Sequence, residues 1–112
     1  LRDIPHPIRV FEISGPLFFA AADQILQINS DKATRVIVIR MRSVPAIDAS
    51  AMKSLRELAD RAKKKKITLV FSHVNEQPMS VMVKDGFTEY VGAQNFHANI
   101  VEALDYAENL VK

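Results

Sequence analysis

The feature that most constrains the fold is an apolar run followed at once by a helical pattern. The run Val36–Ile39 consists only of Val and Ile, which is typical of a strand covered on both faces of a sheet. Beyond Pro45, apolar residues recur at three- and four-residue spacing, which indicates an amphipathic helix. They are Ala51, Met52, Leu55, Leu58, Ala59 and Ala62. A buried strand, a short connection and a covering helix are the repeating unit of parallel α/β sheets.

The same alternation of strand and helix patterns continues along the chain. Further strands are predicted over 8–13, 67–71 and 87–91, and further helices over 17–28, 95–111 and between Asn75 and Gly86. Asn75 and Asn95 are the expected caps, and Leu1–Pro7 reads as an extended lead-in or edge strand. We therefore expect one α/β domain over residues 1–112, with a single open, mostly parallel sheet of four to five strands and about four helices.

Two apolar pairs have both a core and a ligand-binding interpretation. Phe18 and Phe19 suit core packing in the predicted helix, or the lining of a hydrophobic pocket. Met79 and Met82, together with Val83, mark the expected buried side of the short helix, although methionines also form adaptable binding surfaces. Core packing is the simpler interpretation of both pairs.

Composition excludes several classes of function. Fifteen Lys and Arg against thirteen Asp and Glu leave a net charge of only +2, too little to indicate nucleic-acid binding. The chain has no Cys, and His6, His73 and His97 lack metal-ligand spacing, so we predict no metal and no cofactor. No apolar stretch approaches the roughly 20 residues of a membrane span. No nucleophile–base pair or Gly-rich phosphate loop is visible, so we expect no catalysis.

One basic run stands out from this near-neutral composition. Lys63–Lys66 closes the central predicted helix, where cations complement the helix dipole. A solvated helix end is one interpretation of the run. A surface for an acidic partner or an anionic membrane is the other.

The candidate functional site is the start of the central helix. Asp48 is the expected N-cap, and Ser50 falls in the first turn, at the edge of the sheet where the strands end. We expect Asp48, Ala49, Ser50 and Ala51 to contact a partner or an anion. The plainer interpretation is that Asp48 is only a helix cap and Ser50 only an ordinary first-turn residue.

Two local motifs and the order of elements resemble the STAS domain, named after sulfate transporters and anti-sigma factor antagonists. Residues 14–21, Ser-Gly-Pro-Leu-Phe-Phe-Ala-Ala, resemble the version found in SulP-family anion permeases. Residues 44–55, Val-Pro-Ala-Ile-Asp-Ala-Ser-Ala-Met-Lys-Ser-Leu, are similar to the signature loop of the whole family. The resemblance covers about Arg9 to Val111 and implies a STAS-like fold.

The signature loop distinguishes two branches of that family. In the anti-sigma factor antagonists it typically reads Asp-Ser-Ser-Gly or Asp-Ser-Thr-Gly, and a partner kinase phosphorylates the second hydroxyl residue. Ser50 keeps that hydroxyl here, while Ala49 and Ala51 depart from the pattern. The departures favour the permease branch. The alternative is a stand-alone antagonist switched by phosphorylation of Ser50.

The permease resemblance implies a non-catalytic role beside a membrane. Such a domain follows the membrane domain of a sulfate-type transporter and lies on the cytoplasmic face of the inner membrane. It supports folding, trafficking, oligomeric contacts or regulation. The implied partners are the transmembrane domain of the same protein, cytoplasmic regulatory proteins and a second copy through a full-length homodimer. The chain begins Leu-Arg-Asp rather than with Met, and we expect a fragment of a longer protein.

Overall fold

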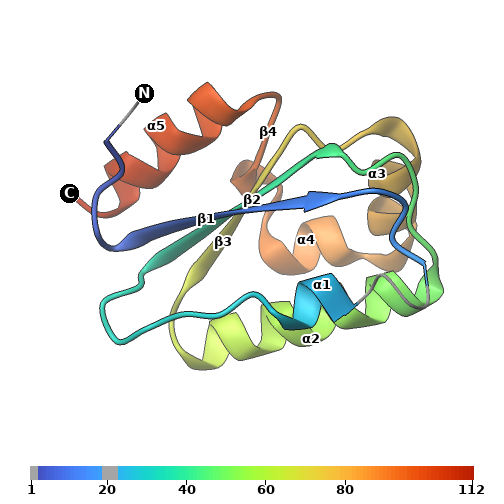
Figure 1. Cartoon of the computed structure of the whole chain (residues 1–112), viewed down its shortest axis with the longest axis horizontal. Coiled ribbons are helices and arrows are strands. Elements are labelled where there is room, and N and C mark those ends of the chain that lie inside the picture. The colour runs from blue at the N-terminus through green and yellow to red at the C-terminus, as the bar shows by residue number, and fades with distance from the viewer. Residues whose placement is uncertain (1–2, 19–22) are drawn as a thin grey trace.

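Four parallel strands form one open sheet with helices on both faces (Figure 1). The computed structural model describes residues 3–18 and 23–112. The strands are β1 (Ile8–Ser14), β2 (Val36–Ser43), β3 (Thr68–Ser72) and β4 (Phe96–His97), in the spatial order β1-β2-β3-β4. The helices are α1 (Asp23–Leu26), α2 (Ala49–Lys64), α3 (Glu76–Asp85), α4 (Phe87–Val91), the 3₁₀ turn η1 (Ala93–Asn95) and α5 (Ile100–Leu110). This arrangement confirms the predicted fold class.

The sheet separates two apolar layers of unequal size. On one face, Ile37, Ile39 and Met41 of β2 pack in a large core with the buried side of α2. On the other face, Val36 and Val38 pack with a smaller set that includes Ala103, Leu104 and Ala107 of α5. The alternation follows from the period of two along a strand. Val36–Ile39 are all buried, so the prediction of a doubly covered strand is confirmed.

Helix α2 is the main cover of the larger core, and it forms as its sequence pattern predicts. Its apolar stripe lies entirely inside the molecule, each side chain at most 4% exposed, while charged residues occupy the outer face. Burying such a stripe is what stabilises a surface helix, since propensity alone is weak. Because α2 runs antiparallel to its neighbouring strands, it begins at their carboxyl ends and finishes at their amino ends (Figure 1).

The prediction of a strand at 87–91 is wrong, because this segment is helix α4. Gly86, at φ 81°, ends α3 and also precedes α4. Phe87 is then fully buried and meets the ring of Phe71 edge-on at 5.7 Å. Residues three and four apart share a helix face, so Tyr90 and Val91 also pack against the core. The last strand is β4, where Phe96 stacks on Phe71 at 5.0 Å.

Other predicted boundaries also differ from the structure. Leu17 lies in a short bridge rather than in a helix, so the predicted helix over 17–28 is confirmed only within α1. Residues 19–22, including Phe19, lie outside the described residues, and Phe18 is 49% exposed, which contradicts its core packing. Val83 is likewise 58% exposed. The last helix starts at Ile100 with Asn99 as its cap, not Asn95, and residues 3–7 form no strand.

Candidate functional site

The candidate site is the connection from β2 to α2 at the carboxyl ends of the strands. We call residues 44–51 the rim corner. Asp48 has an extended backbone, and its carboxylate Oδ1 accepts the Ala51 N–H at 2.9 Å. This bond satisfies one of the four N–H groups that a helix start leaves unpaired. The prediction of Asp48 as the N-cap is confirmed.

The backbone of residues 15–17 fixes one side of the rim corner. Gly15 donates its N–H to Ser43 O at 2.9 Å, and Leu17 donates to Ala46 O at 2.9 Å. The Asp48 N–H returns a bond to Leu17 O at 3.1 Å, completing a short parallel bridge between Leu17 and Ile47. The segment that follows β1 therefore extends the sheet locally and holds the cap residue in place.

Two amide side chains from the start of α3 fix the other side. Gln77 makes two bonds with one residue: its Oε1 accepts the Ile47 N–H at 2.8 Å, and its Nε2 donates to Ile47 O at 3.1 Å. Asn75 Nδ2 donates to Val44 O at 2.8 Å and to Arg42 O at 3.0 Å. Asn75 does occupy the N-cap position of α3, as predicted, but its side chain makes no capping bond. Sequence reasoning missed the role of both amides.

The four predicted contact residues of the rim corner differ in their exposure to solvent. Ala49 is exposed, Asp48 and Ser50 are half-buried, and Ala51 is fully buried, so Ala51 contributes its backbone N–H to the cap. An open hollow of about 410 Å³ adjoins this edge between α2 and α3. Its lining consists of Asp48, Ala49, Met52, Lys53, Arg56, Val81 and Asp85.

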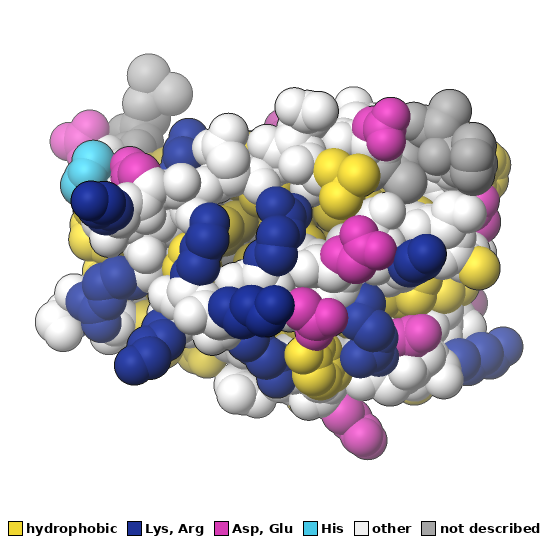
Figure 2. Space-filling model, turned by 90° about the horizontal axis from the view of Figure 1, so that it is seen from below, with side chains coloured by type: hydrophobic (Ala, Val, Ile, Leu, Met, Phe, Trp, Pro, Cys, Tyr) yellow, Lys and Arg dark blue, Asp and Glu magenta, His cyan; other side chains and the backbone are white. Residues whose placement is uncertain are grey.

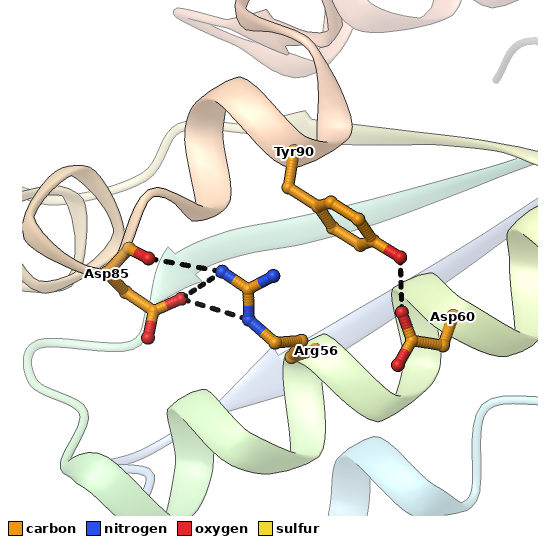
Figure 3. A network of polar contacts seen from close by, with 4 residues as sticks. All are labelled: Arg56, Asp60, Asp85 and Tyr90. Atoms are coloured by element: carbon orange, nitrogen blue, oxygen red, sulfur yellow. Dashed lines mark hydrogen bonds and ion pairs between the residues drawn. The ribbon is translucent and has the colours of Figure 1, made fainter.

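Polar contacts join α2 to α3 and α4 (Figure 3), and Arg56 and Asp85 among them line the hollow. Arg56 binds the carboxylate of Asp85 through Nε at 3.2 Å and Nη2 at 2.5 Å, and Nη2 also reaches Asp85 O at 3.1 Å. The Tyr90 hydroxyl donates to the Asp60 carboxylate. That hydrogen bond, followed by burial and the carboxylate charge, raises the pKa of the Tyr90 phenol above its ordinary value of 10. These contacts position α3 and α4 against α2.

Within residues 3–18 and 23–112, no three His, Asp or Glu side chains gather as a metal site would require. His73 and His97 do come together, through a bond from the His73 N–H to His97 O at 2.9 Å. None of the helices that the structure describes is both long enough and apolar enough to cross a membrane.

The fold and the rim corner define a small α/β domain with a rigid edge, and comparison with known proteins identifies its family. The family model described as the STAS domain matches residues 2–103, so this chain belongs to the STAS domain family. A sulfate transporter family protein from Wolinella succinogenes is 32% identical, with a TM-score of 0.88 over 98% of this chain and 92% of that chain. The SulP transporter STAS domain from Vibrio cholerae is 26% identical, with a TM-score of 0.81, covering 97% of this chain and 87% of that one.

Longer relatives carry transporter names. The putative sulfate transporter YvdB of Bacillus subtilis (strain 168) is 27% identical over 92 residues, covering 80% of this chain and 17% of the relative. The probable sulfate transporter 4.2 of Arabidopsis thaliana is 24% identical over 119 residues, covering 93% of this chain and 18% of the relative. This chain thus spans less than a fifth of these curated relatives. The predicted resemblance to the STAS domains of SulP permeases is confirmed.

Proposed function

We propose that this chain is the cytoplasmic interaction and regulatory domain of a SulP-type inorganic anion transporter and performs no catalysis itself. Its membership of the STAS family and its similarity to proteins named sulfate transporters support this role. The chain matches only 17% and 18% of two such relatives, so transport would reside in the remaining sequence of a protein of that kind. The anion itself would be sulfate or a related oxyanion.

The observation that carries the proposal is the combination of rigidity and display at the rim corner. Backbone bonds from residues 15–17 and amide bonds from Asn75 and Gln77 hold the corner from two sides. Ala49 and part of Ser50 nevertheless face outward. A surface that is ordered before binding loses little conformational entropy on association. The transmembrane domain of the same protein is the primary partner, with cytoplasmic regulatory proteins and a homodimer of the full-length transporter as further ones.

Ser50 gives this contact surface a means of regulation. A phosphate there would add about two negative charges beside the N-terminal N–H groups of α2. The Asp48 carboxylate two residues earlier would oppose them, so phosphorylation would change the surface potential more than the fold. The stand-alone antagonist is not favoured, because the similar proteins are transporters and Ala49 and Ala51 depart from the antagonist loop.

A bulky cation at the rim corner tests the proposal directly. Ala49→Arg places a long side chain on an exposed position in the first turn of α2, and Ala93→Arg makes the same change on exposed η1. Both variants are made in the full-length transporter, and sulfate uptake is measured in cells with equal amounts of protein in the membrane. We expect Ala49→Arg to lower uptake several-fold and Ala93→Arg to leave it unchanged. The thermal midpoint of each isolated domain checks that folding is intact.

Three outcomes would decide against the proposal. Equal uptake by Ala49→Arg and the unaltered transporter would show that the rim corner contacts nothing that matters for transport. An equal loss from Ala93→Arg would show that any surface charge is harmful, wherever it lies. A separated domain that hydrolyses or transfers a group of a small molecule would remove the non-catalytic role.

A further inference from the structure

The opposite end of α2 carries a dense group of cations. We call Lys32, Arg61, Lys63, Lys64, Lys65 and Lys66 the basic cluster, and all six are exposed. Figure 2 shows the face of the molecule on which α2 lies. Lys and Arg side chains predominate over the half of that face where α2 ends. The other nine Lys and Arg residues of the chain are outnumbered by its thirteen acidic residues. The cluster therefore accounts for the whole of the excess positive charge.

One lysine of the cluster occupies a backbone position that does not suit it. Helix α2 ends with the Ile67 N–H bonded to Ala62 O at 2.8 Å and the Lys66 N–H bonded to Lys63 O at 3.1 Å. This pair of bonds is the Schellman motif, which requires a left-handed residue, usually glycine. Lys66 has φ 60° at this position. A lysine there costs stability that glycine would not.

The acidic residue beside the cluster does not neutralise it. Asp31, Lys32 and Lys65 line an open hollow of about 440 Å³ between the loop before β2 and the end of α2. The Asp31 carboxylate accepts the Thr34 hydroxyl at 3.0 Å and the Ala33 N–H at 2.9 Å. Neither of these hydrogen bonds comes from a lysine of the basic cluster. Lys65 Nζ instead reaches the hydroxyl of Ser30 at 3.4 Å, which leaves its charge uncompensated by that partner.

We propose that the basic cluster binds the anionic headgroups of a phospholipid membrane. This rests on the proposed function, which places the domain beside a membrane. Each Lys or Arg near an anionic lipid surface strengthens attachment, and exposed lysine chains adapt readily to such a surface. The 16 residues of α2 span about 24 Å between the rim corner and the cluster. A domain lying along the membrane would thus contact protein at one end and lipid at the other.

A pair of matched double variants tests the proposal. Co-sedimentation is measured with vesicles of phosphatidylcholine and phosphatidylserine, and with vesicles of phosphatidylcholine alone. Lys64→Gln with Lys65→Gln removes two charges from the cluster, whereas Arg42→Gln with Lys84→Gln removes two exposed charges near the carboxyl ends of the strands. We expect the first double variant to bind mixed vesicles roughly thirtyfold more weakly and the second to bind as the unaltered chain does.

The Lys66→Gly variant separates lipid binding from folding. Glycine relieves the left-handed position, so we expect a higher thermal midpoint together with vesicle binding weakened about fivefold. A loss of binding in a more stable protein is not explained by unfolding. Lys66→Gln is the companion variant, because it removes the charge and keeps the strained backbone.

Several results would overturn the inference. Equal binding to mixed and neutral vesicles, or an equal loss in both double variants, would remove the role of the cluster. Binding of polyglutamate without binding of vesicles would assign it to an acidic protein instead. Vesicle binding by Ala49→Arg should match that of the unaltered chain. If that variant loses transport while the cluster variants bind lipid normally, the lipid inference fails and the rim corner keeps its proposed function.

Discussion

The two ends of helix α2 are held in different ways. At its start, Asp48 caps the helix, and side chains and backbone from both neighbouring segments bind the preceding loop. At its end, a strained Lys66 turns the chain, Lys65 reaches the hydroxyl of Ser30 at 3.4 Å, and Lys63 Nζ lies 3.8 Å from the centroid of the Tyr90 ring. Bonds at the first end favour one fixed geometry. The positive charges at the second end would attract an anionic surface without requiring one fixed binding geometry. The contrast suggests a shape-specific contact at the rim corner and an electrostatic one at the basic cluster.

The largest expected effect comes from removing an amide that holds the rim corner. Asn75→Ala removes the donor to the carbonyls of buried Val44 and exposed Arg42, and an unpaired buried carbonyl costs on the order of 1–3 kcal/mol. We expect a loss of about 2 kcal/mol in the free energy of unfolding, measured with urea. Lys65→Ala at the other end should change it by less than about 0.5 kcal/mol. Equal losses of unfolding free energy in the two variants would show that the two ends of α2 are held equally firmly.

Removal of the cap should have a smaller effect. Asp48→Ala deprives the Ala51 N–H of its acceptor, and the loss of an N-cap typically costs about 1 kcal/mol. Asp48→Asn keeps an acceptor oxygen and is the matched control. Urea unfolding of both variants separates the cap from the negative charge. The account fails here if the Asn variant is as unstable as the Ala variant, because charge rather than capping would then dominate.

A negative charge in the first turn of α2 should hardly change stability. Ser50 is half-buried at a helix start, where the dipole favours an anion and Asp48 opposes it. We expect Ser50→Glu to keep its thermal midpoint within a few degrees while altering partner binding, and Ser50→Gln to serve as the uncharged control. Unfolding of Ser50→Glu, but not of the control, would contradict the outward placement of this residue.

The smallest effect concerns the acidic residue beside the basic cluster. Hydrogen bonds from the Thr34 hydroxyl and the Ala33 N–H lower the pKa of the Asp31 carboxyl from its ordinary 3.8. The resulting stabilisation is therefore present above pH 3.8 and is lost as the pH falls through the folded-state pKa. Thr34→Val should raise that pKa in an NMR titration of the carboxyl carbon. An unchanged value would show that the Thr34 hydroxyl does not stabilise the charged form of Asp31.

Local sequence signals predicted the rim corner's helix but not the contacts that fix it. The spacing of apolar residues and the cap at Asp48 involve residues within one or two turns of the same helix, so the sequence alone predicts them. Asn75 and Gln77 act across 30 or more residues, and an amide has no local signal for such a role. The predicted contacts of Ala49 and Ser50 with a partner stay predictions, since their surface position alone does not reveal what touches them.

The error at α4 has the same origin. Phe87-Thr-Glu-Tyr-Val91 is rich in β-formers, and β-propensity is easily overridden by packing. As a helix, this segment brings Phe87 to Phe71 and Tyr90 to Asp60, contacts that depend on the rest of the fold. The predicted helix over 17–28 was placed too early for a similar reason, because Leu17 pairs with Ile47 thirty residues away. Contacts with residues far away in the sequence determine the secondary structure at both places.

Single cysteines at the two ends of α2 test the central claim most directly, because this chain contains no native Cys. Ala49→Cys and Lys64→Cys are introduced separately into a cysteine-free version of the full-length transporter, and each is labelled with a short photo-crosslinker in native membranes. The account predicts that Ala49→Cys yields adducts with the transporter's membrane domain and Lys64→Cys yields adducts with phospholipid. Adducts of the same kind from both positions would contradict the division of roles between the two ends.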